Sequence, residues 1–470
     1  MAMEDHTTVK LLLPRQDFAG QPLFEPTVDA ATDWVQNLPV TNTNSLVEQL
    51  SQALGELNRM SLSPELRFGI LATLLPNLQV AVLNLSKRFL NQPLIMPEEP
   101  RRMAEMSDKL LTLATTAYSI VAIEAIQQRD AIRKMNPARL TCEALQRALL
   151  FSGRKVLQNF QMHQSMGARG WQTLHQLYAL ADSQRLADLP VPEPLSGGNT
   201  IKTTYLQALM LGCCKANQLR HTDLSALYRG FQQWSERIHF DVQSTGKDLF
   251  VVDLDSDQAA MYTALYRDEP GSTCRFIDTT ALVEHLTELK EEAGGKDINF
   301  DKNTNVPVTL LEHLITSLGS MSLRNFKRSR SDNALRICIG LHSTHFHVAG
   351  ERLFEELVCN TSDASGISEA SADNPFLDPL RQADVWQMAN PGDYTGDLKL
   401  VPNLLVDLDS STKARLFQEN ASDLPVAERY PIFEAKLADS SPGGYCLEWT
   451  AELPGDIKAG DIVGLKEEEH

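Results

Sequence analysis

The sequence lacks a long uninterrupted apolar run, and its cysteines are few and scattered. Its most apolar stretch, residues 70–85, is broken by Pro76 and by polar residues, so we expect no membrane-spanning segment. The seven cysteines are odd in number, and the adjacent pair Cys213 and Cys214 is badly placed for a strain-free disulfide. The N-terminus also lacks the apolar core of a signal peptide. These absences predict a cytoplasmic protein in a reducing compartment.

The chain also lacks an excess of positive charge and the common catalytic motifs. Its formal net charge of −18 argues against general affinity for nucleic acid, because DNA-binding faces are basic. A GxSxG nucleophile turn and a phosphate-binding P-loop are both absent from the sequence. We therefore expect no DNA partner, no catalytic residue, no metal and no cofactor, and we interpret the protein as non-enzymatic.

The length and the changes in residue pattern predict a multidomain α+β protein. At roughly 100–200 residues per domain, 470 residues suggest two to four domains. We expect an N-terminal extension without clear periodicity, an all-α helical domain, a small α/β middle module or divergent barrel, and a C-terminal antiparallel β-barrel, over residues 1–43, 44–240, 241–320 and 321–470 respectively.

A helical period dominates the second region. Ser63, Pro64 and Glu65 form a helix start, with an N-cap, a first-turn proline and an acid near the positive end of the dipole. Further helices are predicted over residues 97–128, 136–161, 170–184, 203–219 and 223–238. Trp171 to Tyr178 resembles the opening of a tetratricopeptide helix, although no 34-residue repeat follows. A bundle and a repeat array both remain open, and either offers surface for a protein partner.

The C-terminal half carries strand signals. Strands are predicted over residues 248–253, 275–278, 337–348, 398–401, 431–438, 444–449 and 461–465, and helices over 279–292 and 308–318. Residues 293–306 are polar and are predicted to form a loop. A Ser-, Ala- and Asp-rich stretch within residues 359–395 is expected to be a flexible insertion in the barrel.

An island of positive charge precedes the predicted barrel. Between Arg324 and Arg336 five cations stand against one acid, in a chain that is otherwise strongly acidic. Four of the five are arginines, whose planar guanidinium binds phosphate through two parallel hydrogen bonds. A guanine base also presents O6 and N7 acceptors that suit this fork. The island therefore predicts a site for an anionic, phosphate-bearing ligand.

A second candidate element is the turn of sequence Asp439-Ser440-Ser441-Pro442-Gly443-Gly444, which a predicted strand follows. A short carboxylate can accept hydrogen bonds from the N1 and N2 edge of a guanine. A serine hydroxyl and free turn amides can donate to phosphate oxygens. Glycines let the backbone approach a ligand closely.

The two elements together resemble the PilZ family of bacterial cyclic di-GMP receptors. Arg324-xxx-Arg328 matches the family's RxxxR segment, with Arg330 as an alternative second member, and Asp439-x-Ser441-x-x-Gly444 matches its [D/N]xSxxG segment. The resemblance implies that the arginines bind the phosphates and a guanine Hoogsteen edge. It also implies that Asp439 and Ser441, with the turn through Gly443 and Gly444, hold the other guanine.

Two features depart from the family pattern. The motifs lie about 110 residues apart, and the chain ends soon after the fourth expected strand. The barrel is therefore either incomplete or completed by the preceding module or by a second subunit in a homodimer. The resemblance implies a cyclic di-GMP receptor in motility, pilus or biofilm regulation that signals to a partner through its helical domain. The alternative is a helical interaction scaffold with a degenerate barrel that binds no ligand.

Two weaker signals suggest other chemistry. Asp253 and Asp255 end a predicted strand in the manner of a magnesium-dependent phosphohydrolase, although the second acidic motif of such enzymes is missing. His345 and His347 would share one face of the strand predicted over residues 337–348. Zinc needs more ligands than these two, so ordinary core or surface histidines are favoured.

Overall fold

The protein is described by a computed structural model. The structure describes residues 10–90, 92, 96–191, 200–301, 304–321, 329–330, 333–353, 429–441, 444–449, 457 and 461–467. The chain divides into two compact units. The first is formed by the chain up to residue 323, except for residues 93–95, and the second by the chain from residue 324 onward.

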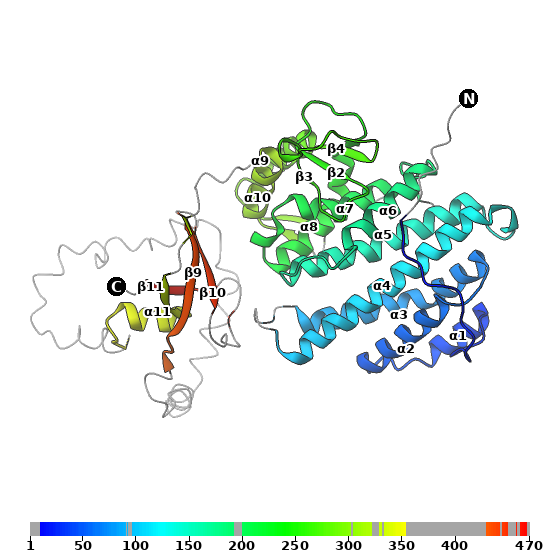
Figure 1. Ribbon diagram of the computed structural model, residues 1–470, viewed down its shortest axis with the longest axis horizontal. Coiled ribbons are helices and arrows are strands. Elements are labelled where there is room, and N and C mark those ends of the chain that lie inside the picture. The colour runs from blue at the N-terminus through cyan, green and yellow to red at the C-terminus, as the bar shows by residue number, and fades with distance from the viewer. Residues whose placement is uncertain are drawn as a thin grey trace, which may run out of the picture. The chain divides into compact units, whose positions relative to one another are not determined.

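The first unit is built mainly of helices (Figure 1). Its α-helices before the first strand are α1 (Val28–Gln36), α2 (Thr43–Leu57), α3 (Pro64–Phe89), α4 (Glu98–Gln127), α5 (Pro137–Gln161), α6 (Gly170–Ser183), α7 (Ile201–Cys213) and α8 (His221–Trp234). This arrangement confirms the helical region that the periodicity predicts. Short 3-10 turns follow α4, α7 and α8.

Local signals in the sequence place the ends of these helices. The Ser63 side chain accepts a hydrogen bond from the amide of Leu66 at the start of α3. Asn136 does the same for two amides at the start of α5, directly before Pro137. Each cap satisfies backbone donors that have no partner within the helix, which fixes where the helix begins.

Two helices are long and apolar enough to count as candidate membrane spans, whereas the sequence interpretation expected none. By length and composition, α3 and α4 could each cross a membrane. In the structure, however, 50% of the apolar window of α3 and 67% of that of α4 are buried inside the protein. Their apolar residues pack against each other and against α2 and α5 in one hydrophobic core. The same composition is what a core helix requires.

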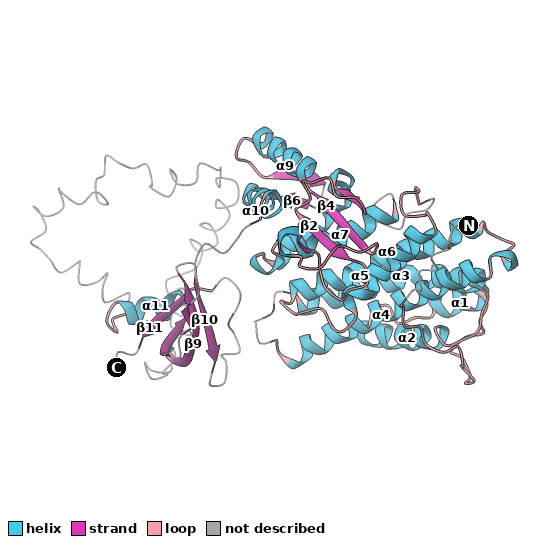
Figure 2. Cartoon of the chain, turned by 45° about the horizontal axis from the view of Figure 1, so that its top comes forward, coloured by secondary structure: helices cyan, strands magenta, loops and turns pink. Residues whose placement is uncertain are grey.

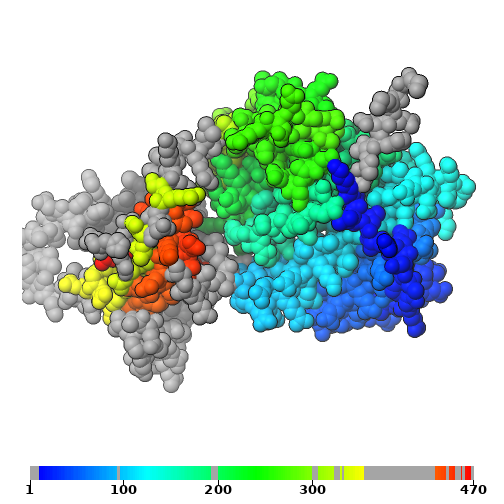
Figure 3. Space-filling view, in the orientation of Figure 1, coloured from blue at the N-terminus to red at the C-terminus, as the bar shows by residue number. Residues whose placement is uncertain are grey.

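The N-terminal extension contains a helix that the sequence analysis did not predict. Residues 28–36 form α1, which Thr27 caps and which packs on α3. The preceding segment crosses the surface of the helices, as the dark blue band in Figure 3 shows. Along this path, the Phe18 amide donates to the Arg59 carbonyl and the Lys10 amide donates to Gln176. The absence of a helical period in residues 10–27 reflects this course.

A small sheet packs against the last helices of the first unit (Figure 2). Its antiparallel strands lie in the order β1-β4-β2-β3, over His239–Asp241, Cys274–Asp278, Phe250–Asp253 and Met261–Tyr262. Helices α9 (Thr280–Ala293) and α10 (Val308–Gly319) follow. The loop predicted over residues 293–306 is wrong in part, because β5 (Ile298–Asp301) and β6 (Thr304–Val306) form a hairpin there. The buried residues of this module belong to the same core as the helices.

As far as the structure describes it, the second unit is an antiparallel sheet with one helix. Its strands are β7 (Ser329–Arg330), β8 (Ala334–Ile339), β9 (Phe433–Ser441), β10 (Gly444–Trp449) and β11 (Val463–Glu467). They lie in the order β10-β9-β8-β11, and β7 pairs with β9. Among the described residues the sheet does not close into a barrel. The predicted strand at residues 398–401 and the insertion at 359–395 lie outside the described residues.

The strand predicted over residues 337–348 is wrong after residue 339. The strand β8 ends at Ile339, and Leu341–Val348 form α11. Gly340 separates the two elements with φ +86°, a conformation that L side chains rarely adopt. His345 and His347 therefore lie on a helix, and the His347 ring is hydrogen-bonded to the Tyr430 carbonyl at 3.0 Å.

Candidate ligand site on the C-terminal sheet

The end of the arginine-rich segment pairs with the acidic turn motif. In the register of β7 and β9, Ser329 lies opposite Ser440 and Arg330 lies opposite Asp439. The segments are more than a hundred residues apart in the sequence, and the sheet brings them to adjacent strands. Side chains directly opposite in an antiparallel pair share one face, with Cβ atoms about 4.5–5.5 Å apart.

A β-bulge turns Asp439 away from the hydrophobic core of the sheet. On β10, Leu447 pairs with Leu437 whereas Cys446 pairs with Asp439, so Ala438 is left without a partner on that strand. Leu437 and Leu447 pack in the core of the sheet. Since successive residues of a strand alternate in direction, Cys446 and its partner Asp439 face away from this core. Bulges commonly re-aim side chains at functional sites in this way.

The Asp439–Arg330 pair is accessible on this face. Arg330 and Cys446 are exposed, and Asp439 is half-buried. We refer to the surface carrying these three residues as the outer face. A carboxylate beside a guanidinium there can bind the donor edge of a guanine and a phosphate or acceptor edge at the same time. This combination suits a guanine nucleotide.

The turn of the motif closes a tight hairpin between β9 and β10. Ser441 pairs with Gly444, so two residues connect the strands. Gly444 has φ +146°, which favours glycine, and the space where a Cβ would stand is open. The register also places Tyr445 opposite Ser440 and Cys446 opposite Asp439. Neither Tyr445 nor Cys446 was a predicted site residue. Counting outward in both directions from a two-residue turn would have placed them opposite Ser440 and Asp439.

The structure places only part of the predicted site. It brings Arg330, Asp439 and Gly444 together on adjacent strands, and it describes Ser441 through its backbone pairing. The predicted residues Arg324, Arg328 and Gly443 lie outside the described residues.

The acidic turn after β2, which carries Asp253 and Asp255, holds neighbouring segments of the first unit together. Asp257 accepts hydrogen bonds from the amides of Arg169 and Gln172 at the start of α6. Asp255 forms an ion pair with Lys10 at 2.8 Å, and the Asp253 carboxylate accepts from the Asp255 amide. Within the described part of the chain, no group of three or more His, Cys, Asp or Glu residues could hold a metal ion.

Comparison with known families gives two consecutive matches. The family described as cyclic-di-GMP receptor FimW, N-terminal domain, matches residues 29–245. The family described as cyclic-di-GMP receptor FimW, middle PilZ domain, matches residues 249–470. The chain therefore belongs to a family of PilZ-domain cyclic di-GMP receptors, which confirms the resemblance seen in its two motifs. This family assignment points to a binding protein rather than an enzyme.

A curated relative supports the same family along most of the chain. The chain is 28% identical over 444 residues to the cyclic-di-GMP receptor FimW of Pseudomonas aeruginosa. The match covers 92% of this chain and 71% of the relative. No solved structure matches the chain.

Proposed function

We propose that this protein is a cytoplasmic receptor that binds cyclic di-GMP on the outer face of the C-terminal sheet. Arg324 and either Arg328 or Arg330 bind the phosphates and one guanine Hoogsteen edge. Asp439 and Ser441, with the turn through Gly443 and Gly444, hold the other guanine. Each role follows from the match of these residues to the family's motifs.

The observation that carries the proposal is the pairing of Arg330 with Asp439. Arg330, the alternative second member of the arginine motif, lies on the strand next to Asp439 of the distant acidic motif, so one ligand can contact both residues. The ligand is a dianion, and the arginine island offers the charge to balance it in a chain of net charge −18.

A calorimetric titration with cyclic di-GMP tests this assignment. Wild-type protein should show saturable binding, and the double variant Arg324→Ala/Arg328→Ala should bind at least tenfold more weakly, because a hydrogen bond to a charged group contributes about 1.5–3 kcal/mol. A wild-type protein that gives no saturable heat favours the alternative, a helical scaffold with a silent sheet. Unchanged affinity in the double variant would place the ligand in another pocket.

The same titration decides which arginine completes the motif. Arg330 and Arg336 are both exposed, and their partners on β9, Asp439 and Glu434, lie five residues apart, about 16 Å along that strand. If Arg330 contacts the ligand, Arg330→Ala weakens binding whereas Arg336→Ala does not. If Arg328 is the true second member, Arg330→Ala also binds normally and Arg328→Ala alone reproduces the loss.

The helical unit is proposed to pass the signal to a protein partner, in motility, pilus or biofilm regulation. Its sheet module and helices share one core, so the unit can move as a whole in response to the ligand. The C-terminal sheet is proposed to become a barrel through the rest of the chain or through a second subunit. Sedimentation with and without cyclic di-GMP separates these cases, because only the second predicts a dimer.

A further inference from the structure

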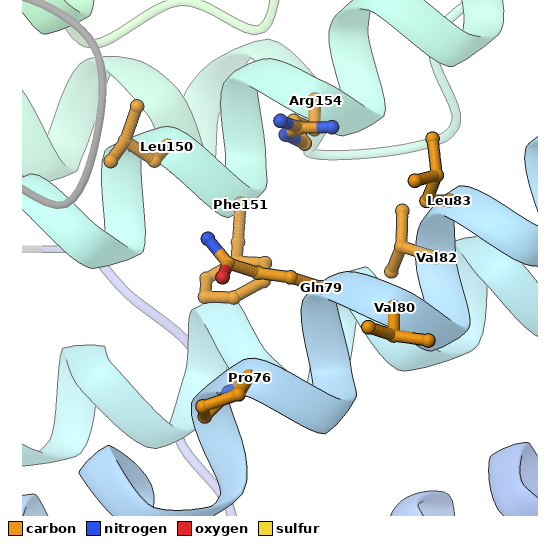
Figure 4. Close-up of a pocket in the computed structure, with 8 residues that line it drawn as sticks. All are labelled: Pro76, Gln79, Val80, Val82, Leu83, Leu150, Phe151 and Arg154. Atoms are coloured by element: carbon orange, nitrogen blue, oxygen red, sulfur yellow. The ribbon is translucent and has the colours of Figure 1, made fainter. Parts of the chain in front are cut away.

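A hollow of about 400 Å³ lies between α3 and α5 in the helical unit. Figure 4 shows its walls, with Pro76 and Leu83 on α3 and Phe151 and Arg154 on α5. This volume lies within the roughly 300–1,000 Å³ typical of small-molecule sites. The hollow belongs to the first unit and has no part in the nucleotide site proposed above.

The hollow has an apolar floor and a single charge. Val82, Leu150 and Phe151 are at most 7% exposed and form its buried part. Val80 and Leu83 border it with 40% and 51% of their surfaces exposed. Six of the eight lining residues are apolar, and Arg154 is the only charged one. Large apolar side chains gathered in an open concavity indicate a binding surface.

The positive charge of the hollow is not neutralised nearby. Among the described residues, Arg154 has no carboxylate within ion-pair distance, whereas its neighbour Lys155 is paired with Asp108 at 3.1 Å. A second cation, Arg147, lies seven residues earlier on the same face of α5. It is buried over the Phe68 ring, and two of its nitrogens lack hydrogen-bond partners. Glu143, at 3.7 Å, offsets part of this charge.

We propose that this hollow binds a free fatty acid. The aliphatic chain lies along the apolar floor toward Pro76, and the carboxylate meets the Arg154 guanidinium. Charge complementarity favours an anionic head group. Size argues against a helical peptide, because one turn about 10 Å wide and 5.4 Å long would already occupy roughly 400 Å³. An extended aliphatic chain is narrow enough to follow the floor.

The test uses dodecanoate as the probe and the full chain, in calorimetry below the concentration at which the probe forms micelles. Wild-type protein should bind dodecanoate saturably and should not bind dodecyltrimethylammonium, which has the same chain and the opposite charge. Arg154→Gln should weaken dodecanoate binding roughly two- to fivefold, the range expected for an exposed ion pair. Arg101→Gln, at an exposed position on α4, is the matched control and should bind like wild type.

A second variant tests the apolar wall. Leu83→Asp removes an exposed apolar side chain and adds a negative charge, so dodecanoate binding should fall about tenfold. The affinity for cyclic di-GMP should be unchanged in both variants, which separates this proposal from the one for the C-terminal sheet. No saturable binding of dodecanoate, equal binding of the cationic probe, or unchanged affinity in Arg154→Gln would overturn the proposal. A wild-type dimer that Leu83→Asp dissociates would instead assign the hollow to a second copy of the chain.

Discussion

Cys446 provides a direct reporter of where the ligand binds. Its thiol is exposed, and its position lies directly opposite Asp439 on the outer face. A nucleotide held by Asp439 must lie within a few ångströms of this thiol, because the Cβ atoms of opposed residues are about 4.5–5.5 Å apart. We therefore expect cyclic di-GMP to protect Cys446 from alkylation by N-ethylmaleimide.

The size of the protection follows from mass action. If only the free protein reacts, the alkylation rate falls by the factor 1 + [L]/Kd, which is about 100-fold at a ligand concentration of 100 Kd. Mass spectrometry of the Cys446 peptide, sampled over time, measures this rate separately from the other cysteines. The Asp439→Ala variant should lose the protection at the same ligand concentration.

Buried cysteines serve as internal controls. Burial raises the pKa of Cys142 to about 11 and that of Cys214 to about 12, so little thiolate forms at neutral pH. Both should react slowly with or without ligand. If calorimetry shows saturation by cyclic di-GMP while the alkylation rate of Cys446 stays constant, the ligand does not bind on the outer face.

Three predictions concern stability, each measured by urea unfolding. Asp257→Ala removes the cap of α6 and should cost about 0.5–2 kcal/mol. Arg67→Met leaves Glu124, its buried partner at 3.6 Å, without a counter-charge and should cost about 3–5 kcal/mol; a loss below 1 kcal/mol would show that the pair is dispensable. Burial lowers the pKa of His175 below its usual 6.5. The unfolded chain then binds the extra proton as the pH falls below about 6.5, so wild type should lose stability there, and His175→Gln should lose less.

The sequence predicted the helical region well because its signals are local. Ser63 and Pro64, like Asn136 and Pro137, mark helix starts within a few residues. The helix at residues 28–36 was missed although Thr27 caps it, because its nine residues are fewer than the roughly 11–18 over which a helical period is read. The hairpin at residues 298–306 was missed because its polar residues carry little strand signal.

The site was only partly predictable for a different reason. The two motifs identified the residue types, but the adjacency of Arg330 and Asp439 depends on pairing across more than a hundred residues. The direction of Asp439 depends on the bulge at Ala438, which no local pattern specifies. Without the bulge, strict alternation from Leu437 would point Asp439 toward the core. The exposed thiol of Cys446 became relevant only through the register of the hairpin.

The most direct test of the account compares two carboxylates on one strand. Asp439 and Glu434 both lie on β9 and face away from the core, about 16 Å apart along the strand. In calorimetry with cyclic di-GMP, Asp439→Ala should weaken binding roughly tenfold to a hundredfold, and Glu434→Ala should leave the affinity within about twofold of wild type. Equal affinities for wild type and Asp439→Ala would contradict the proposed site.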